Sequence, residues 1–140
     1  MIKFYIADIE KCLNLEKSKN KDYYFKILNK KADDFITSAS INSNEIFCKH
    51  STLFIAIKGK KFDATDFLLQ AKKSGANSFI IDKKNWENKN RCFKKKIIEN
   101  LQNIIITNNV EKTFQVVAEK FLDLGKKIVE QEKNEILKKI

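Results

Sequence analysis

Short runs of β-branched and aromatic residues alternate along this chain with segments whose apolar residues recur every three or four positions. The short runs predict strands, and the longer spacing predicts helices. The expected strands cover residues 3–5, 23–28, 35–41, 52–57, 77–82 and 103–107. The expected helices cover residues 7–13 and 66–74 and a long segment from residue 111 onward. This alternation predicts an α/β fold, in which helices flank a small mixed β-sheet.

The clearest unit combines the strand over residues 52–57, a basic loop over residues 58–64 and the helix over residues 66–74. Thr65 is the expected N-cap of that helix, because threonine hydroxyls accept from free backbone N–H groups at helix starts. Gly75 follows the helix, where a left-handed residue commonly ends it. The next strand comes at once, so we expect a β-loop-α-β core unit with a right-handed parallel crossover.

The remaining segments are expected to be loops, an insertion and a long C-terminal helix. Polar residues predict loops over residues 14–21 and 42–51, and residues 83–100 are interpreted as a basic, partly helical insertion. The long helix carries an apolar face that we expect in the core, formed by Phe114, Val117, Ala118, Phe121, Leu122 and Ile128. Gly125 is expected to loosen this helix.

The length of the chain predicts one domain with its own core. We assign residues 1–128 to that domain and residues 129–140 to a charged helical extension. No apolar run reaches the about 20 residues that cross a bilayer, and Asp8 and Glu10 near the start argue against a signal peptide. The chain is therefore predicted to be cytoplasmic, with no membrane partner.

The net charge of +10 comes from 28 lysine and arginine residues, and Arg91 is the sole arginine. Nucleic-acid-binding proteins rely on arginine and cluster their charge, whereas these lysines are spread along the chain. The charge alone therefore does not favour nucleic acid as a partner. Cys12, Cys48, Cys92 and the lone His50 lack metal-ligand spacing, so we predict reduced thiols and no metal site.

A candidate ligand loop follows the strand over residues 52–57. Gly59 lets the backbone approach a ligand, and Lys60 and Lys61 offer donors to a phosphate or carbonyl. Phe62 offers a stacking surface for a planar base, and Asp63 offers an acceptor for a ring N–H or a sugar hydroxyl. An ordinary β-to-α turn, with solvated lysines and Phe62 in the core, is the alternative.

Other site patterns are absent or are better explained by local structure. The chain has neither a P-loop nor a GxGxxG fingerprint. With His50 as the sole histidine, a Ser-His-Asp set is not expected. The pairs Asp33–Asp34 and Asp63/Asp66 are expected in turns and helix caps rather than in acid–base chemistry. We therefore predict no catalytic residue.

Residues 86–96 contain the best nucleic-acid feature of the chain. Basic side chains at Arg91 and Lys94–Lys96 stand near two aromatic residues, Trp86 and Phe93, and aromatic rings beside cations can stack on bases. A small basic nucleic-acid-binding module is therefore an alternative function. A solvated insertion with its aromatic side chains turned inward explains the same residues.

Several blocks of sequence follow one another in a characteristic order. They are Leu53-Phe54-x-Ala56-Ile57-x-Gly59-x-x-Phe62-Asp63-Ala64-Thr65-Asp66-Phe67, then Gln70-Ala71, Gly75-Ala76, Phe79-Ile80-Ile81, Ile104-Ile105-Ile106 and Val117-Ala118. In these blocks, residues from about 36 to 122 resemble the N-terminal domain of the Mur ligases. The resemblance is closest to the ligase that adds D-alanyl-D-alanine to UDP-N-acetylmuramoyl tripeptide, and second to the ligase that adds the third stem residue.

The resemblance implies a domain that binds the UDP moiety of a UDP-N-acetylmuramoyl peptide in peptidoglycan synthesis. The implied UDP-binding residues are Glu45, Gly59, Lys60, Lys61, Phe62 and Asp63. Asn44-Glu45-Ile46 stands where the family has Asp-Ser/Thr-Arg, and Thr65 replaces the motif histidine.

The chemistry of the Mur ligases uses ATP and Mg²⁺ in a central domain. The resemblance implies that such a domain follows residues 129–140 in a longer parent enzyme, and that the remaining Mur ligase domains are partners of this one. We expect no cofactor and no ligase activity in these 140 residues alone. A catalytically inactive stand-alone paralogue that serves as a scaffold is a further alternative.

Overall fold

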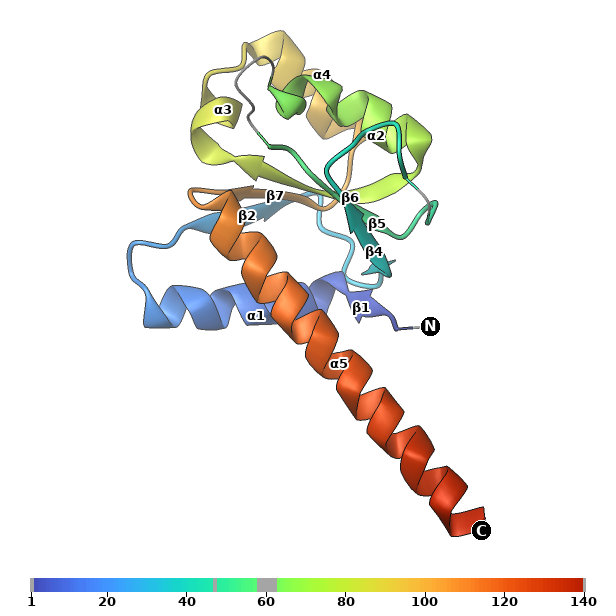
Figure 1. The fold of residues 1–140 in the computed structure, drawn as a ribbon. Coiled ribbons are helices and arrows are strands. Elements are labelled where there is room, and N and C mark those ends of the chain that lie inside the picture. Colours follow the sequence, from blue (N-terminus) through green and yellow to red (C-terminus); the bar gives the residue numbers. More distant parts are fainter. Residues whose placement is uncertain (1, 47, 58–62, 140) are drawn as a thin grey trace.

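The structure of the protein is a computed structural model that describes residues 2–46, 48–57 and 63–139. The chain forms three layers, in which a mixed β-sheet lies between helices on both of its faces (Figure 1). The predicted α/β class, with a mixed sheet flanked by helices, is therefore confirmed.

The main sheet contains five strands in the order β2-β7-β6-β5-β4. Its strands are β2 (Phe25–Leu28), β4 (Ser38–Ser40), β5 (Thr52–Ile55), β6 (Ala76–Asp82) and β7 (Ile104–Thr107). The four strands β4 to β7 run parallel, and β2 is antiparallel to β7. Strands β5 and β7 are buried along their whole length, which is typical of parallel strands covered on both faces and explains their continuous apolar sequence.

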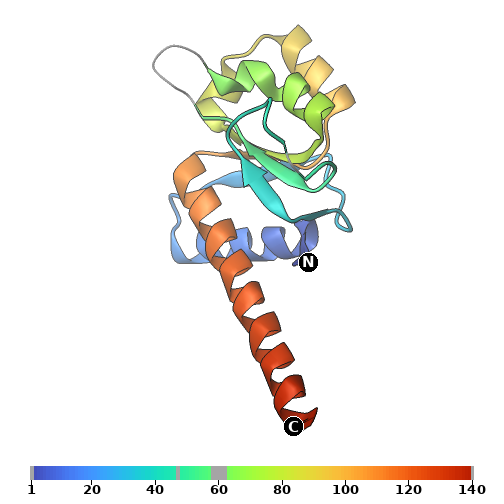
Figure 2. The ribbon, with the colours of Figure 1, turned by 45° about the vertical axis from the view of Figure 1, so that its right-hand side comes forward.

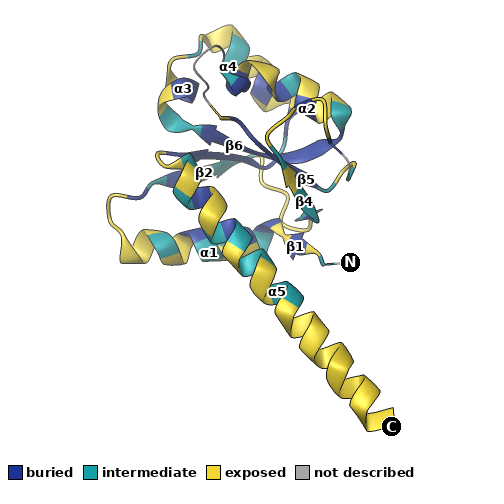
Figure 3. Ribbon diagram, viewed as in Figure 1, coloured by how far each residue is buried: buried dark blue, intermediate teal, exposed yellow. Residues whose placement is uncertain are grey.

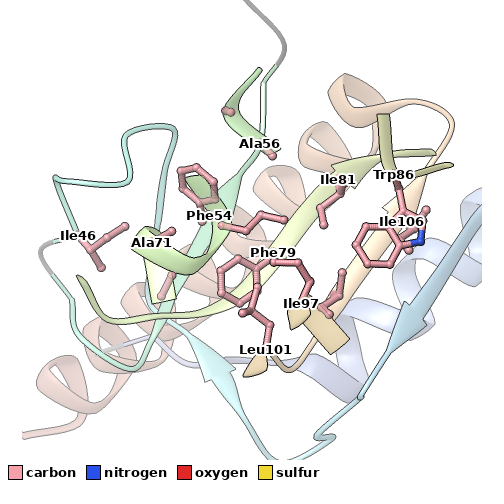
Figure 4. Packing of buried hydrophobic residues seen from close by; sticks show 14 residues of the cluster. Ile46, Phe54, Ala56, Ala71, Phe79, Ile81, Trp86, Ile97, Leu101 and Ile106 are labelled. Carbon is pink, nitrogen blue, oxygen red and sulfur yellow. The ribbon is translucent and has the colours of Figure 1, made fainter. Parts of the chain in front are cut away.

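Three helices cover one face of the sheet: α2 (Leu68–Ser74), α3 (Lys83–Glu87) and α4 (Arg91–Asn100). Phe54 and Phe79 project from the sheet into a core that also contains Trp86 and Ile97 of these helices (Figure 4). The segment 83–100 is therefore helical and forms the crossover between β6 and β7, and it contributes to the core as well as to the basic surface.

The opposite face is covered by helices from the two ends of the chain, α1 (Ile6–Lys19) and α5 (Val110–Lys139), as both views show (Figures 1 and 2). Ile9, Leu13 and Val117 from these helices join Ile80 and Ile105 of the sheet in a second core. The molecule thus has one apolar core on each side of its central sheet.

Helix α1 is longer than the sequence analysis predicted, because residues 14–19 continue the helix instead of forming a loop. Their polar character reflects exposure, since the buried residues of α1 are Ile6, Ile9 and Leu13. Lys17 and Lys19 lie in the last turn, where positive charge favours the helix dipole.

The predicted strand over residues 35–41 is divided between two sheets. β3 (Phe35–Ile36) pairs antiparallel with β1 (Phe4–Tyr5), whereas β4 pairs parallel with β5. Between them, the Thr37 N–H donates to the Ser51 carbonyl at 2.7 Å, so the chain changes its partner at this residue.

Asp63, rather than Thr65, begins the helical segment after β5. The Asp63 carboxylate accepts from the Thr65 N–H at 2.9 Å and starts a 3₁₀ turn, η1 (Ala64–Phe67), which delays α2 to Leu68. Thr65 is fully buried, and within the described ranges its hydroxyl has no hydrogen-bond partner. The predicted Thr65 cap is therefore wrong, because the carboxylate two residues earlier takes that role.

The first half of α5 packs on the body and the second half projects away from it, as the exposed residues in Figure 3 show. Val117 is buried as expected, but Phe114, Leu122 and Ile128 are 37%, 63% and 40% exposed. The helix also runs unbroken through Gly125. In the parts of the chain that the structure describes, no helix combines the length and apolarity needed to cross a membrane.

Candidate functional site

A pocket of about 1010 Å³ lies at the carboxyl ends of the parallel strands β4, β5 and β6, beside the first turns of α5. In open α/β sheets, ligands bind in the crevice outside the carboxyl ends of the strands. The volume is at the upper end of the range usual for small-molecule sites, about 300–1,000 Å³. This pocket is therefore the candidate binding site.

Exposed apolar side chains form part of the pocket wall. Ile41, Ile57 and Phe114 are 62%, 46% and 37% exposed, and all three line the pocket. The predicted core position of Phe114 is wrong for this reason: its ring borders an open cavity instead of packing on the sheet. An exposed aromatic ring in a concave site can contact the face of a planar ligand.

Carboxylates outnumber cations among the described residues of the pocket. Glu45, Asp82 and Glu111 line it together with one ammonium group, that of Lys84, although the chain carries a net charge of +10. Glu45 and Glu111 are exposed and form no ion pair among the described residues. The Asp82 carboxylate accepts from the Asn85 N–H at 3.1 Å and so caps α3.

A hydrogen-bonded turn after β4 presents Glu45 to the pocket. The Ser40 hydroxyl accepts from the Asn42 N–H at 3.1 Å and lies 3.1 Å from the Glu45 carbonyl. The Asn42 amide oxygen accepts from the Asn44 N–H at 2.9 Å, and the Asn44 side chain accepts from Gln70 of α2. These contacts hold the turn that contains Glu45 against the body of the domain.

Of the other predicted UDP-binding residues, the structure describes Asp63. Gly59, Lys60, Lys61 and Phe62 lie outside the described residues, so of the predicted set the structure places Glu45 and Asp63. On the two flanks of that segment, the Ala64 N–H donates to the Ile57 carbonyl at 3.2 Å. Ile57 itself lines the pocket.

Asp63 is not among the described residues that line the pocket, and its carboxylate already has partners. Besides accepting from the Thr65 N–H, it lies 3.6 Å from the Lys89 ammonium group, which also contacts Asp66 at 2.6 Å. The hydrogen bond with Asp66, together with the charges of Asp66 and Asp63, raises the pKa of Lys89. These ion pairs tie the turn after β5 to the connection between α3 and α4.

A scan against protein-family models matches no family, and a search of curated proteins finds no significant match to the sequence.

The residues of the nucleic-acid alternative do not form a stacking surface. Trp86 is 6% exposed and lies in the core beneath α3, and Phe93 packs against the same core. The Lys94 ammonium group lies 3.3 Å from the Glu87 carbonyl, and Lys95 pairs with Glu99 at 3.8 Å. The interpretation of these aromatic residues as turned inward is confirmed, and the basic residues stand without exposed rings beside them.

Among the pocket residues that sequence reasoning did not assign to a ligand site are Asn85, Glu111 and Phe114. Asn85 lies shortly after β6, and Glu111 and Phe114 lie shortly after β7. Because parallel strands place their carboxyl ends at one edge, polar and aromatic residues just after those strands were an available signal.

Proposed function

We propose that this chain holds the uridine-diphosphate end of a UDP-N-acetylmuramoyl peptide, in the manner of a Mur ligase N-terminal domain. One observation supports this proposal above the others: Glu45, at the position of the family's Asp-Ser/Thr-Arg triplet, and Ile57, in the matching block that begins at Leu53, line the same pocket. The pocket also lies at the sheet edge where α/β proteins bind small molecules.

The lining suits the nucleoside half of such a ligand. The Phe114 ring offers an apolar surface to a base, and the carboxylates of Glu45 and Glu111 offer acceptors to ribose hydroxyls. Carboxylates repel phosphates, so we assign the diphosphate to the cations that the sequence supplies at Lys60 and Lys61.

The proposal gives this chain a holding role and no catalytic step. Mur ligases use ATP and Mg²⁺ to activate a carboxylate. Across residues 2–46, 48–57 and 63–139, no group of three metal-ligating side chains is placed to hold a metal ion. The resemblance places that chemistry in a separate central domain, so we expect the 140-residue chain to show no ligase activity.

Titration of the ¹⁵N-labelled chain with UDP-N-acetylmuramoyl tripeptide tests the proposal. The amide signals of Glu45, Ile57 and residues 58–63 should shift, whereas those of the projecting half of α5 should not. If none of the pocket signals moves at millimolar ligand, the chain does not bind this substrate independently.

Replacing the pocket aromatic gives a second test, because Phe114→Ala should weaken binding of the same ligand about tenfold through lost contact with the base. Its effect on unfolding should stay below about 1 kcal/mol, since the ring is 37% exposed. Leu122→Ala is the matched control, because Leu122 lies on the same helix, is 63% exposed and does not line the pocket. Equal affinity in both variants would contradict a role for Phe114.

A further inference from the structure

Helix α5 carries a row of exposed apolar side chains that continues from its packed half into its projecting half. We call this row the α5 stripe, and its members are Phe114, Leu122, Val129, Ile136 and Leu137, which are 37% to 65% exposed. Leu122, Val129 and Ile136 follow one another at intervals of seven residues, close to two helical turns, so they lie on one side of the helix. A row of exposed apolar side chains of this kind marks an interaction surface.

The body of the molecule does not cover the α5 stripe. The side of α5 that packs on the body carries Val117, Phe121 and Leu124, which belong to the second core. Within the part of the chain that the structure describes, residues 126–139 are all exposed, as Figure 3 shows. The partner of the stripe therefore comes from another molecule.

The charges along α5 identify that partner as a second copy of the same helix. Glu111 and Glu119 are exposed on the packed half, and Lys133 and Lys139 are exposed on the projecting half. None of the four forms an ion pair among the described residues. One half thus offers free carboxylates and the other offers free ammonium groups, a pattern in which the helix is complementary to its own reverse.

An antiparallel pair with Leu122 opposite Val129 satisfies the apolar and the charged positions in one register. Because both helices rise equally per residue, the same register brings Phe114 opposite Leu137. It also brings Glu119 opposite Lys133 to within one residue. Two-fold symmetry repeats each of these pairs. A parallel pair would instead place the two acidic halves together and the two basic halves together.

We infer that the α5 stripe is a docking surface for a second copy of this chain, and that the two copies pair antiparallel along it. The projecting half of each copy lies along the packed half of the other, over about 36 Å from Phe114 to Leu137. This inference is independent of the proposed function.

The dimer is expected to be weak. Each chain carries a net charge of +10, and Lys126 of both copies lies near the two-fold axis, so long-range repulsion opposes the contact. We expect a dissociation constant on the order of 100 µM. At a few micromolar the chain is then a monomer, and its thermal stability is that of the body alone.

Sedimentation equilibrium of the wild-type chain gives the first test. In about 0.15 M salt, repulsion beyond about 8 Å is screened, whereas ion pairs in contact are retained. The average mass should rise from that of one chain at about 5 µM to about 1.8 times that value at about 1 mM. A chain that stays monomeric at about 1 mM would leave the stripe to a different partner, such as another domain, and would overturn the inference.

Val129→Glu tests whether the stripe forms the contact. It places a charge at the centre of the interface and should weaken dimerisation at least about tenfold. Leu15→Glu is the matched control, because Leu15 is 61% exposed on α1 and Val129 is 65% exposed on α5. It should stay within about twofold of wild type. Both variants should melt within about 2 °C of wild type at low concentration, because both side chains are exposed. Equal weakening by the two variants would contradict a role for the stripe.

A charge exchange tests the antiparallel register. Glu119→Lys should weaken the dimer about three- to tenfold, because it sets two ammonium groups against each other at both symmetric positions. Adding Lys133→Glu restores opposite charges across the interface, so the double variant should return to within about twofold of wild type. If Lys133→Glu brings no recovery, the two residues do not face each other and the antiparallel register is wrong.

Discussion

Gly75 links the end of α2 to the turn before β5. Its φ of 119° is left-handed, and its carbonyl accepts from the His50 N–H at 2.6 Å. A Cβ atom at this position would lie 2.9 Å from the Lys49 Cα atom, which is part of the backbone and has little room to move. Both the conformation and the space therefore require glycine here.

We expect Gly75→Ala to destabilise the chain by about 1–3 kcal/mol. Gly125→Ala is its counterpart in the interior of α5, where the nearest atom is the Ile2 Cδ1 at 3.0 Å, at the end of a flexible side chain. That variant should be stabilising by up to about 1 kcal/mol, because alanine favours the helix. Urea unfolding of both variants measures the difference, and equal effects would contradict the role of Gly75.

Of the two predicted site residues that the structure describes, Glu45 and Asp63, Glu45 lines the pocket. Under the proposed function, Glu45→Gln removes a negative charge near the bound nucleotide and keeps the shape of the side chain. The affinity for UDP relative to uridine should rise about two- to threefold, because only UDP carries the phosphates that the carboxylate repels. Calorimetric titration measures this ratio. Glu130→Gln, on the projecting half of α5, removes the same charge at a distance and should leave the ratio unchanged.

Residue-level roles were predictable where local chemistry decides them. Gly75 follows from helix-ending rules, and the predicted turn at Asp33–Asp34 agrees with the hydrogen bond that the Asp34 N–H donates to the Lys31 carbonyl at 3.0 Å. The prediction that Thr65 caps the helix was wrong because both Asp63 and Thr65 have side chains that can accept from a free backbone N–H at a helix start. In the structure the Asp63 carboxylate takes this role by accepting from the Thr65 N–H.

At the scale of elements, Lys89 joins η1 to the connection between α3 and α4. Its ammonium group contacts Asp66 at 2.6 Å and lies 3.6 Å from Asp63. The same ammonium group also lies 5.3 Å from the centroid of the Phe93 ring in α4 and so makes a cation–π contact. One side chain therefore bridges two segments that flank the pocket edge.

We expect Lys89→Met to destabilise the chain by about 1 kcal/mol, the upper end for partly exposed pairs. The pKa of Lys89 is raised above its ordinary value of 10.5, so this stabilisation is complete below that pH and is lost as the pH rises through the raised pKa. The difference between wild type and Lys89→Met should therefore shrink in strongly alkaline solution. Thermal melts at neutral and alkaline pH measure it, with Lys96→Met as an exposed control that forms no ion pair among the described residues. A constant difference across this range would contradict the ion-pair explanation.

The existence and type of most elements were predictable, because β5, β6 and β7 are continuous apolar runs and α2 has clear end signals. Two predicted element boundaries were wrong. Residues 14–19 were predicted as a loop because they are polar, but an exposed helical turn needs no apolar residues. Residues 35–41 were predicted as one strand because the sequence does not show the change of partner strand at Thr37.

At the scale of the whole molecule, α5 divides into a packed half and a projecting half. Residues 126–139 are all exposed, whereas Val117 is 2% exposed and belongs to the core between α1, α5 and the sheet. The projecting half therefore contributes little to the stability of the body.

A chain that ends at Lys127 should melt within about 2 °C of the full chain. A chain that ends at Val116 should be strongly destabilised, because it lacks Val117 and Phe121 of the second core. Calorimetry of the two truncated chains distinguishes the halves of α5. A large loss of stability on removing residues 128–140 would show that the projecting half is needed.

The pocket as a whole could not be predicted, although its location follows from the topology. Its walls come from residues 39–45, 55–57, 82–88 and 110–114, which meet because β4, β5 and β6 are neighbours and α5 starts just after β7. The alternation of elements predicts a sheet, but it does not give the order of the strands within it.

The pairing of β2 with β7 has a consequence for the synthesis of the chain. β2 is made early, yet its partner strand is among the last elements to be made, and the Tyr23–Thr113 hydrogen bond joins residues 90 positions apart. During synthesis on the ribosome, β2 therefore stays without its partner strand β7 until most of the chain has emerged. Such non-local closure slows folding and exposes a strand edge to other nascent chains. We expect the charged side chains of this region, among them Lys17, Lys19 and Lys21, to keep it in solution until β7 has been made.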